Sequence, residues 1–322
     1  MTTILETRHL FKYFKSSGGY VHAVDDISMH VEESKTLGIV GESGCGKSTL
    51  GRTVIGLHHA DSGDVYFQGQ EISRMKEREF KHLRGNMQII MQDPFSSLNP
   101  RMNVCNIIAD PLKVNHRVGS KAELNQQVKE LMDTVGLARR YIYSYPHELD
   151  GGRRQRVAIA RAIALKPKLI VCDEPVSALD VSIQAQTLNL LMDLQEELNL
   201  TYLFISHNLS VVKHISHDIM VMYLGQVIER ASSDELFARP LHPYTQALLK
   251  AIPVPDYYYY QNEETEVLAG EVSDAIDPPP GCRFAPRCPK ATDCCYQKAI
   301  PLKTVAPGHE VACILCQSCD NG

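Results

Sequence analysis

The chain has 322 residues, of which 44% are hydrophobic and 22% charged, and its formal net charge is −5. This composition is typical of a globular protein with room for two domains, and an acidic balance without a long basic run argues against nucleic acid as a partner. No apolar stretch approaches the roughly 20 residues that a membrane-spanning helix needs, and the N-terminus has no signal pattern, so we expect a cytosolic chain.

The first 60 residues predict strands around a glycine-rich loop. Residues 4–10 and 27–31 alternate apolar and polar side chains, as half-buried strands do, and residues 16–19 mark a turn between them. Tyr13 and Phe14 end the first of these strands. Either ring could stack on an adenine or pack as an ordinary core aromatic.

The glycine-rich loop follows the apolar run 36–40 and precedes a helical pattern. A strand, a glycine-rich turn and a helix in this order are what a phosphate-binding loop requires. Glycines let successive N–H groups point at a phosphate, and the helix N-terminus adds donors and a positive dipole end. Lys47 supplies a charge for the outer phosphates and Ser48 a hydroxyl for Mg²⁺. We therefore predict nucleotide binding by Gly41, Glu42, Ser43, Gly44, Cys45, Gly46, Lys47 and Ser48.

Beyond this loop, strands alternate with helices. We expect strands at 65–67, 87–91, 169–172 and 202–205, and helices within 103–142, after Asp150 and over 182–198. The runs at 169–172 and 202–205 do not alternate, which is typical of buried parallel strands. The pattern predicts an α/β protein with a mostly parallel sheet covered on both faces.

Polar residues stand where two of these strands end. Asp173 and Glu174 follow one strand, where such folds hold Mg²⁺ through water and polarise an attacking water. An acidic pair is often only a solvated loop, but the phosphate loop upstream favours the catalytic interpretation. His207 follows another strand, where ligands gather, although a lone histidine is more often structural. Asp150 is well suited to be a helix N-cap.

Together these motifs resemble the ATP-binding subunit of an ABC transporter, and within that group a dipeptide/oligopeptide importer. The resemblance covers essentially the whole chain. Residues 41–48 match the Walker A loop, 169–174 the Walker B strand, Gln92 the Q-loop and His207 the switch histidine. The D-loop is matched by Ser177, Ala178, Leu179 and Asp180, and Phe14 falls at the position that stacks on adenine.

The resemblance implies a P-loop ABC ATPase fold with a RecA-like core, a small antiparallel β subdomain and a helical signature subdomain at about 93–165. The ATPase domain would span 1–238, and a cysteine-rich extension of the peptide-importer type would span 239–322. ATP and Mg²⁺ are the implied cofactors, and ATP hydrolysis to ADP and phosphate is the implied reaction. Nucleotide contacts would come from Phe14, residues 41–48, Thr49, Gln92 and Asp173, with Ser48, Gln92 and Asp173 at Mg²⁺.

In this family two ATPase subunits form a sandwich, and each nucleotide lies between one subunit's Walker A loop and the other's signature loop. Glu174 would be the general base, His207 would contact the γ-phosphate, and Gln92 would reach Mg²⁺ and the attacking water. The implied partners are a second homologous ATPase subunit, two membrane permeases and, indirectly, an extracytoplasmic peptide-binding protein. The chain would lie peripherally on the cytoplasmic face of the cell membrane.

Three alternatives concern the function. The cargo could be nickel or an oligosaccharide instead of short peptides. A soluble ABC ATPase acting on DNA or ribosomes usually has two ATPase halves, a coiled-coil insertion or basic arms, and none is present. The third alternative is a nonenzymatic metal or redox sensor, in which the cysteine-rich tail would report the signal and the nucleotide domain would only regulate it.

The signature loop departs from the family pattern of Leu-Ser-Gly-Gly-Gln. Here it is Leu149, Asp150, Gly151, Gly152 and Arg153. The serine hydroxyl would donate to the γ-phosphate of the partner's ATP, whereas Asp150 cannot donate and its charge opposes the phosphate. Asp serves about as well as Ser as a helix cap. We therefore predict an asymmetric heterodimer, in which the partner's nucleotide facing Asp150 turns over slowly unless Arg153 or Arg154 offsets the charge.

The C-terminal third carries the peptide-importer resemblance at residues 239–249, which include His-Pro-Tyr, and at 281–289 and 308–313. A polar and aromatic stretch at 257–266 is expected to be a linker. Seven of the ten cysteines crowd the last 41 residues, which in a reducing cytosol indicates a metal site.

The resemblance implies that Cys282, Cys288, Cys295 and Cys313 bind a 4Fe–4S cluster. Zn²⁺ is the alternative, but the separations of five, six and seventeen residues are unlike paired zinc knuckles and favour iron–sulfur. Cys294, Cys316 and Cys319 are surplus, and Cys313, Cys316 and Cys319 could themselves bind metal. A metal would order a segment with little core of its own.

Overall fold

The computed structural model describes residues 2–252, 276–278 and 280–316; the expected linker at 257–266 and Cys319 lie outside this part. The chain forms two compact units. The first takes in the chain up to residue 5, residues 30–36 and residues 66–205. The second takes in residues 6–29, 37–65 and the chain from residue 206 on.

A parallel sheet forms the centre of the first unit. Strands β6 (Met87–Ile90), β7 (Leu169–Asp173) and β8 (Thr201–Ile205) pair in parallel, with β7 in the middle. Every residue of β7 and β8 is buried, which explains why these runs lack a polar face. The long helix α7 (Val181–Leu198) connects them. The strands and the helix predicted here are confirmed.

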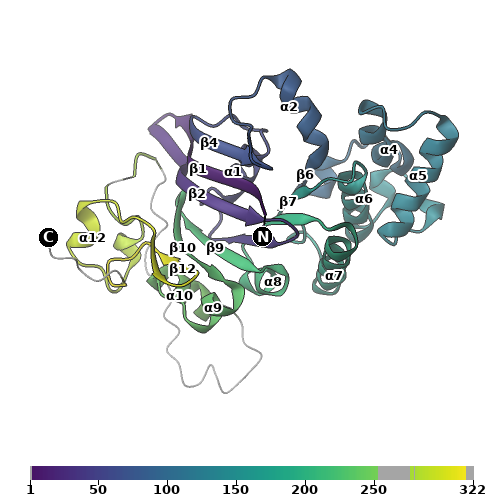
Figure 1. Ribbon diagram of the computed structural model, residues 1–322. Coiled ribbons are helices and arrows are strands. Elements are labelled where there is room, and N and C mark those ends of the chain that lie inside the picture. Colours follow the sequence, from purple (N-terminus) through teal and green to yellow (C-terminus); the bar gives the residue numbers. More distant parts are fainter. Residues whose placement is uncertain (1, 253–275, 279, 317–322) are drawn as a thin grey trace, which may run out of the picture. The chain divides into compact units, whose positions relative to one another are not determined.

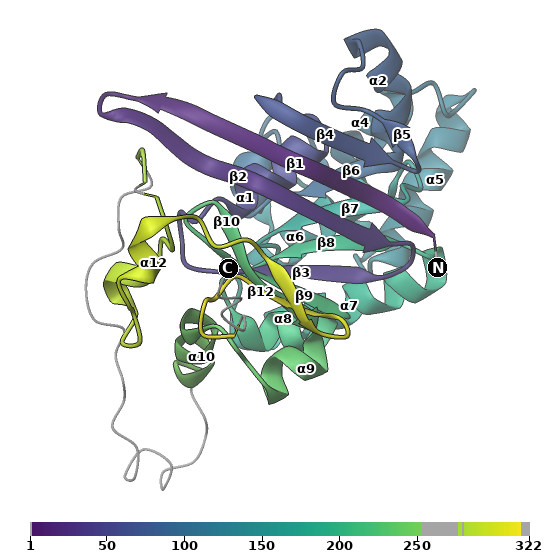
Figure 2. The same ribbon diagram turned by 60° about the vertical axis from the view of Figure 1, so that its left-hand side comes forward.

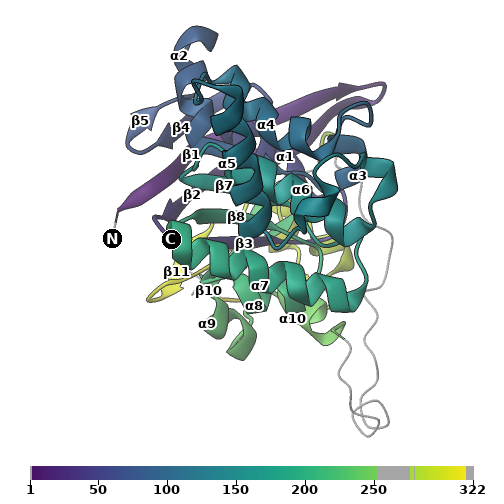
Figure 3. The same ribbon diagram turned by 90° about the vertical axis from the view of Figure 1, so that its right-hand side faces the viewer.

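Three helices of the first unit pack against one another: α4 (Val104–Val114), α5 (Lys121–Thr134) and α6 (Gly151–Ile163) (Figure 3). Apolar side chains on their facing sides, such as Ile108 and Met132, are fully buried. The helical pattern predicted within 103–142 is thus two helices. The smaller elements of this unit are β5 (Gln70–Glu71), α2 (Glu77–Leu83), η1 (Arg84–Asn86), α3 (Pro94–Ser97), η2 (Arg139–Tyr141) and η3 (Pro146–Glu148).

The second unit has a sheet to which both the N-terminal part and the C-terminal region contribute. Strand β3 (Thr36–Val40) pairs in parallel with β9 (Asp218–Tyr223), and β9 pairs antiparallel with β10 (Gln226–Ser232). Further out, β12 (His309–Val311) pairs antiparallel with β10, and β11 (Lys303–Ala306) with β12 (Figure 2). The C-terminal region therefore extends the sheet that carries the phosphate loop.

A long hairpin also belongs mainly to the second unit. Its strands β1 (Thr3–Ser16) and β2 (Gly19–Glu32) meet at the predicted turn, and β4 (Ser62–Phe67) lies on the other side of β1 (Figure 2). The remaining elements, labelled where possible in Figure 1, are α1 (Lys47–Val54), α8 (Leu209–Ile215), α9 (Ser233–Ala238), α10 (Pro243–Lys250), η4 (Ala285–Arg287) and α12 (Cys294–Gln297).

Among the described residues, none of the helices has the length and apolar character required to span a bilayer.

Candidate functional site

The phosphate loop occupies the turn between β3 and α1, as predicted. Gly46 stands immediately before α1 with a φ of 103°, and a Cβ there would lie 1.8 Å from the carbonyl oxygen of Ala23. Any other residue would combine a left-handed backbone with a collision against main chain. Gly46 is therefore required by the close approach of the loop to β2.

Lys47 is the first residue of α1, and 4% of it is exposed. Its Nζ donates to the carbonyl oxygens of Gly41 and Glu42, at 2.8 Å each, and lies 3.7 Å from the Sγ of Cys45. Burial raises the pKa of the Cys45 thiol, so the group beside the ammonium is neutral. The ammonium is thus held inside the curve of the loop. Ser48 and Thr49 follow in the first turn of α1.

The two aromatic residues of β1 have different surroundings. The ring of Tyr13 stacks on His22 with centroids 4.1 Å apart, and its hydroxyl donates to Asp25. Phe14 is 37% exposed and meets His58 edge-on at 5.6 Å. Tyr13 is engaged within its own hairpin, whereas the exposure of Phe14 is compatible with stacking on a base, which remains a prediction.

His207 is exposed and lies between β8 and α8. The residues around it fix the backbone: the Ser206 N–H donates to Ile39 at 3.1 Å, and the Asn208 side chain caps α8 by accepting from two N–H groups. The histidine therefore projects from a well-anchored turn beside the end of β3 in the second unit.

In the first unit, β7 ends with Asp173, which is fully buried, and Glu174 follows with a left-handed φ of 49°. The Glu174 N–H donates to Ile205 of β8 at 2.9 Å, which fixes this strained turn. Gln92, after β6, donates from Nε2 to Oε2 of Glu174 at 3.0 Å. The structure therefore brings together Gln92 and Glu174, which follow separate strands.

The D-loop begins in contact with the same glutamate. The Ser177 hydroxyl donates to the carbonyl oxygen of Glu174 at 3.1 Å. Asp180 is the N-cap of α7 but makes no side-chain capping bond. Leu179 lies against Gly151, where an added Cβ would be 3.3 Å from its side chain. The D-loop and the signature loop are therefore neighbours within the first unit.

Asp150 is the N-cap of α6, and the prediction of this cap is confirmed. Its carboxylate accepts from the N–H of Arg153 at 2.8 Å and forms an ion pair with the Arg153 guanidinium at 2.7 Å. Arg154 instead donates to the carbonyl oxygens of Pro146 and Leu149, 2.9 Å each, which holds the loop before the helix. Arg153, and not Arg154, is the residue that offsets the Asp150 charge.

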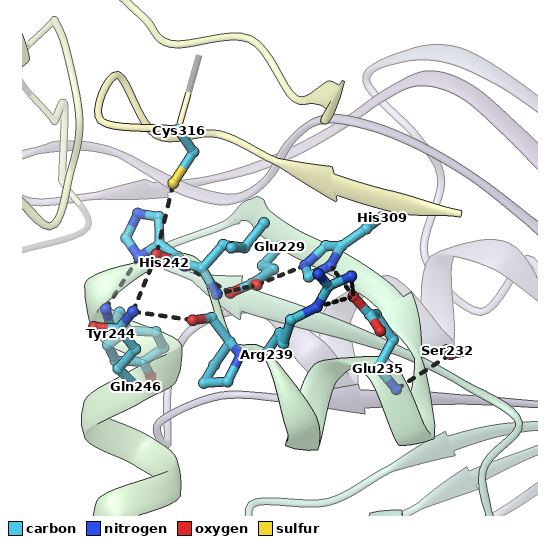
Figure 4. Close-up of polar contacts among 11 residues, drawn as sticks. Glu229, Ser232, Glu235, Arg239, His242, Tyr244, Gln246, His309 and Cys316 are labelled. Carbon is cyan, nitrogen blue, oxygen red and sulfur yellow. Dashed lines mark hydrogen bonds and ion pairs between the residues drawn. The ribbon is translucent and has the colours of Figure 1, made fainter. Parts of the chain in front are cut away.

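The C-terminal region is attached through a buried polar cluster in the second unit (Figure 4). Glu229 of β10 is completely buried and accepts from the N–H groups of Leu241 and His242, at 2.7 and 3.0 Å, and from His309 at 2.8 Å. The other ring nitrogen of His309 lies 3.5 Å from Glu235. One glutamate thus joins β10, the start of α10 and β12. The sequence patterns gave no signal for this cluster.

The same region also reaches the phosphate loop and the β1–β2 hairpin. Tyr244 of α10 accepts from the N–H of Glu42, and Arg287 forms a bidentate ion pair with the Glu42 carboxylate. Arg283 pairs with Asp25 and donates to Leu224. The tyrosine and both arginines belong to the family-like segments, but nothing in the sequence assigned them a contact.

The described part of the C-terminal region does not support the iron–sulfur prediction. Burial is the main cause of the raised pKa of the Cys282 and Cys288 thiols, and the nearby thiol of Cys295 raises both to a smaller extent. Burial also raises the pKa of Cys313 to about 12. No group of three or more His, Cys, Asp or Glu side chains among the described residues is arranged to hold a metal ion.

Known proteins resemble this chain in domain family, in sequence and in fold. A model of ABC transporter ATP-binding domains matches residues 24–177, and a model of the oligopeptide/dipeptide transporter C-terminal region matches residues 228–295. The oligopeptide transport ATP-binding protein AppF of Bacillus subtilis is 50% identical over 97% of both chains. OppF of Escherichia coli is 50% identical over 91% of this chain and 87% of its own.

Solved structures give the same result for the fold. The ATP-binding cassette MJ0796, in a dimeric post-hydrolysis state with ADP and phosphate, has a TM-score of 0.66 at 26% identity, over 71% of this chain and 99% of its own. CbiO1 of Clostridium perfringens has a TM-score of 0.65 at 27% identity, over 74% and 92%. The P-loop ABC ATPase fold predicted from the sequence is confirmed. The chain belongs to the ABC transporter family as an ATP-hydrolysing, ATP-binding protein of the oligopeptide transport type.

Proposed function

We propose that this chain hydrolyses ATP to power the uptake of short peptides through a membrane ABC importer. The observation that carries the proposal is the presence, in one chain, of the ATPase domain and of the C-terminal region characteristic of oligopeptide and dipeptide transporters. Relatives named for oligopeptide transport match over nearly the whole chain. The chain would bind to two permeases on the cytoplasmic face of the membrane and receive peptide from an extracytoplasmic binding protein.

The proposal assigns a catalytic or binding function to single residues. Glu174 is the general base, and the hydrogen bond from Gln92 at 3.0 Å orients its carboxylate. Lys47 and the loop around it bind the outer phosphates, and His207 contacts the γ-phosphate. Mg²⁺ would be held by the Ser48 hydroxyl, the Gln92 amide oxygen and the Asp173 carboxylate, because hard oxygen ligands are the kind that Mg²⁺ prefers. When bound, Mg²⁺ neutralises charge on the phosphates.

The second ATPase subunit is proposed to be a different chain. Asp150 has no proton to donate to a γ-phosphate, so the nucleotide that faces it turns over slowly. A non-identical partner with a serine at this position would complete the nucleotide site of this chain. The ion pair of Asp150 with Arg153 reduces the repulsion but supplies no hydroxyl.

The proposal is tested on the intact membrane complex. We expect the tagged chain to co-purify with two permeases and another ATPase, and the complex in liposomes to accumulate short peptides in the presence of ATP. Glu174→Gln is expected to lower phosphate release by about 100-fold with ATP binding retained, because it removes the base. Transport of nickel or an oligosaccharide by the complex would contradict the assignment of peptides as the cargo. Purification of the chain without permeases would contradict its assignment to a transporter.

A further inference from the structure

Glu42 of the phosphate loop contacts two side chains of the C-terminal region. Its carbonyl oxygen accepts from the Lys47 ammonium at 2.8 Å. Its N–H donates to the Tyr244 hydroxyl at 2.9 Å, and its carboxylate accepts from two nitrogens of Arg287, at 2.8 and 3.1 Å. Three groups of one loop residue are therefore fixed, one by the phosphate-binding lysine and two by side chains more than 200 positions away.

The two distant side chains are themselves rigidly held. Tyr244 is completely buried, and its ring meets Tyr223 and Phe284 edge-on, with centroids 4.8 and 5.3 Å apart. The side chain of Arg287 is 7% exposed and also donates to the Tyr223 hydroxyl at 3.4 Å. A bidentate guanidinium–carboxylate pair in such surroundings fixes both geometry and charge.

The charge matters because the loop must accept a polyanion. The Glu42 carboxylate is on the loop itself, and its side chain is 23% exposed. Arg287 neutralises it, and the hydrogen bonds to Glu42 raise the pKa of Arg287, so the guanidinium is charged throughout the working range. Without Arg287, the carboxylate would repel the phosphates and compete for Lys47.

We infer that Tyr244 and Arg287 are positioning residues for the phosphate loop. They fix Glu42, cancel its charge and hold the carbonyl oxygen that orients Lys47, and they thereby set the affinity for ATP. The C-terminal region acts on nucleotide binding as well as being attached to the ATPase domain. The inference rests on the assignment of residues 41–48 as the ATP-binding loop.

The test is calorimetric titration of the full chain with the non-hydrolysable analogue AMP-PNP and Mg²⁺. Removal of a charge-assisted bidentate pair in Arg287→Met is expected to raise the Kd about tenfold, and loss of one hydroxyl in Tyr244→Phe about threefold. Arg239→Met is the matched control, because Arg239 is an exposed arginine of the same region that pairs with Glu235 and does not contact the loop; it should leave the Kd unchanged.

A double variant establishes whether the effect passes through Glu42. In Glu42→Gln with Arg287→Met, the Kd is expected to return to within about twofold of Glu42→Gln alone, because no uncompensated charge remains. Failure of this rescue would overturn the inference, as would an unchanged Kd in both Arg287→Met and Tyr244→Phe. If Arg287→Met melts at a much lower temperature, Arg287→Lys takes its place. This variant keeps the charge but not the two-pronged guanidinium, so its Kd should lie between that of the wild type and that expected for Arg287→Met.

A Lys47→Ala variant separates this inference from the proposed function. It should abolish binding if the loop is the ATP site, and retained binding would contradict that assignment. Kinetics of the assembled transporter give a second readout. Arg287→Met should raise KM for ATP with little change in kcat, since it alters ground-state binding and not the hydrolysis step. A fall in kcat alone would contradict positioning through the loop.

Discussion

Asp150 has a structural function at the start of α6. As N-cap it satisfies the N–H of Arg153, and its charge is paired with the same residue's guanidinium. The side chains of Asp150 and Arg153 are 52% and 43% exposed, so this ion pair adds little to stability. Its main effect is to reduce the negative charge at the start of α6. The ion pair supplies no hydroxyl donor.

This residue gives a sharp prediction. Asp150→Ala should lower the free energy of unfolding by about 1 kcal/mol through loss of the cap. It should change the ATPase activity of the assembled transporter by less than about twofold, since no γ-phosphate donor is lost. Asp150→Ser, which keeps the cap, is the control for stability. Urea unfolding and phosphate release measure the two effects. A loss of activity in Asp150→Ala as large as that in Glu174→Gln would contradict the asymmetric pair.

Helix α10 starts at a histidine whose protonation state matters. The Nδ1 atom of His242 accepts from the N–H of Tyr244 at 3.1 Å, and the His242 main-chain N–H donates to Glu229. His242 is 1% exposed, and burial lowers its pKa from 6.5 to about 4. The cap therefore depends on a neutral ring, because a protonated Nδ1 cannot accept a hydrogen bond.

The pKa shift has a defined consequence for stability. The unfolded chain binds a proton at His242 near pH 6.5 and the folded chain only near pH 4, so this contribution to stability is present above pH 6.5 and is lost as the pH falls toward 4. Between pH 7.5 and 5 the loss should be about 2 kcal/mol. The control is His242→Asn, which keeps a capping acceptor but does not titrate. Measured by urea unfolding, the loss of unfolding free energy between pH 7.5 and 5 should be larger in the wild type than in this variant by this amount. Equal pH dependence in both would refute the shift.

Local patterns in the sequence were sufficient to predict most elements. The strand–loop–helix around Gly46, the cap at Asp150 and the non-alternating β7 and β8 depend on backbone preferences and burial within a few residues. The contacts of the C-terminal region could not be predicted in this way. Glu42 meets Tyr244 and Arg287 across 202 and 245 positions, and residue spacing carries no information on such pairs. The metal site inferred from cysteine crowding is not supported among the described residues, where no group of three or more His, Cys, Asp or Glu side chains is arranged to hold a metal ion.

At the scale of the whole molecule, the candidate residues are divided between the two units. The phosphate loop, Phe14 and His207 belong to the second unit, and Gln92, Glu174 and the signature and D-loops belong to the first. Hydrolysis in the proposed mechanism also requires a signature loop from another subunit. In this mechanism, the active site is therefore complete only when the second subunit carries a suitable signature loop.

This requirement predicts how the isolated chain behaves. With Glu174→Gln to prevent hydrolysis, the chain with ATP and Mg²⁺ should remain monomeric in size-exclusion chromatography with light scattering. Two copies would place Asp150 opposite both nucleotides. Addition of the second ATPase subunit should produce a dimer. Formation of a stable ATP-dependent homodimer by the isolated chain would contradict the asymmetric pairing.

The pairing of β12 with β10 has a consequence for the chain as a folding unit. Strand β10 pairs with β9 on one side and β12 on the other. A chain shortened to the expected ATPase domain would leave the outer N–H and C=O groups of β10 unpaired and would strip Glu229 of all three hydrogen-bond donors from the C-terminal region. An uncovered strand of this kind is a template for aggregation with other chains. The C-terminal region thus covers an edge of β10 that would otherwise be open to pairing with another chain.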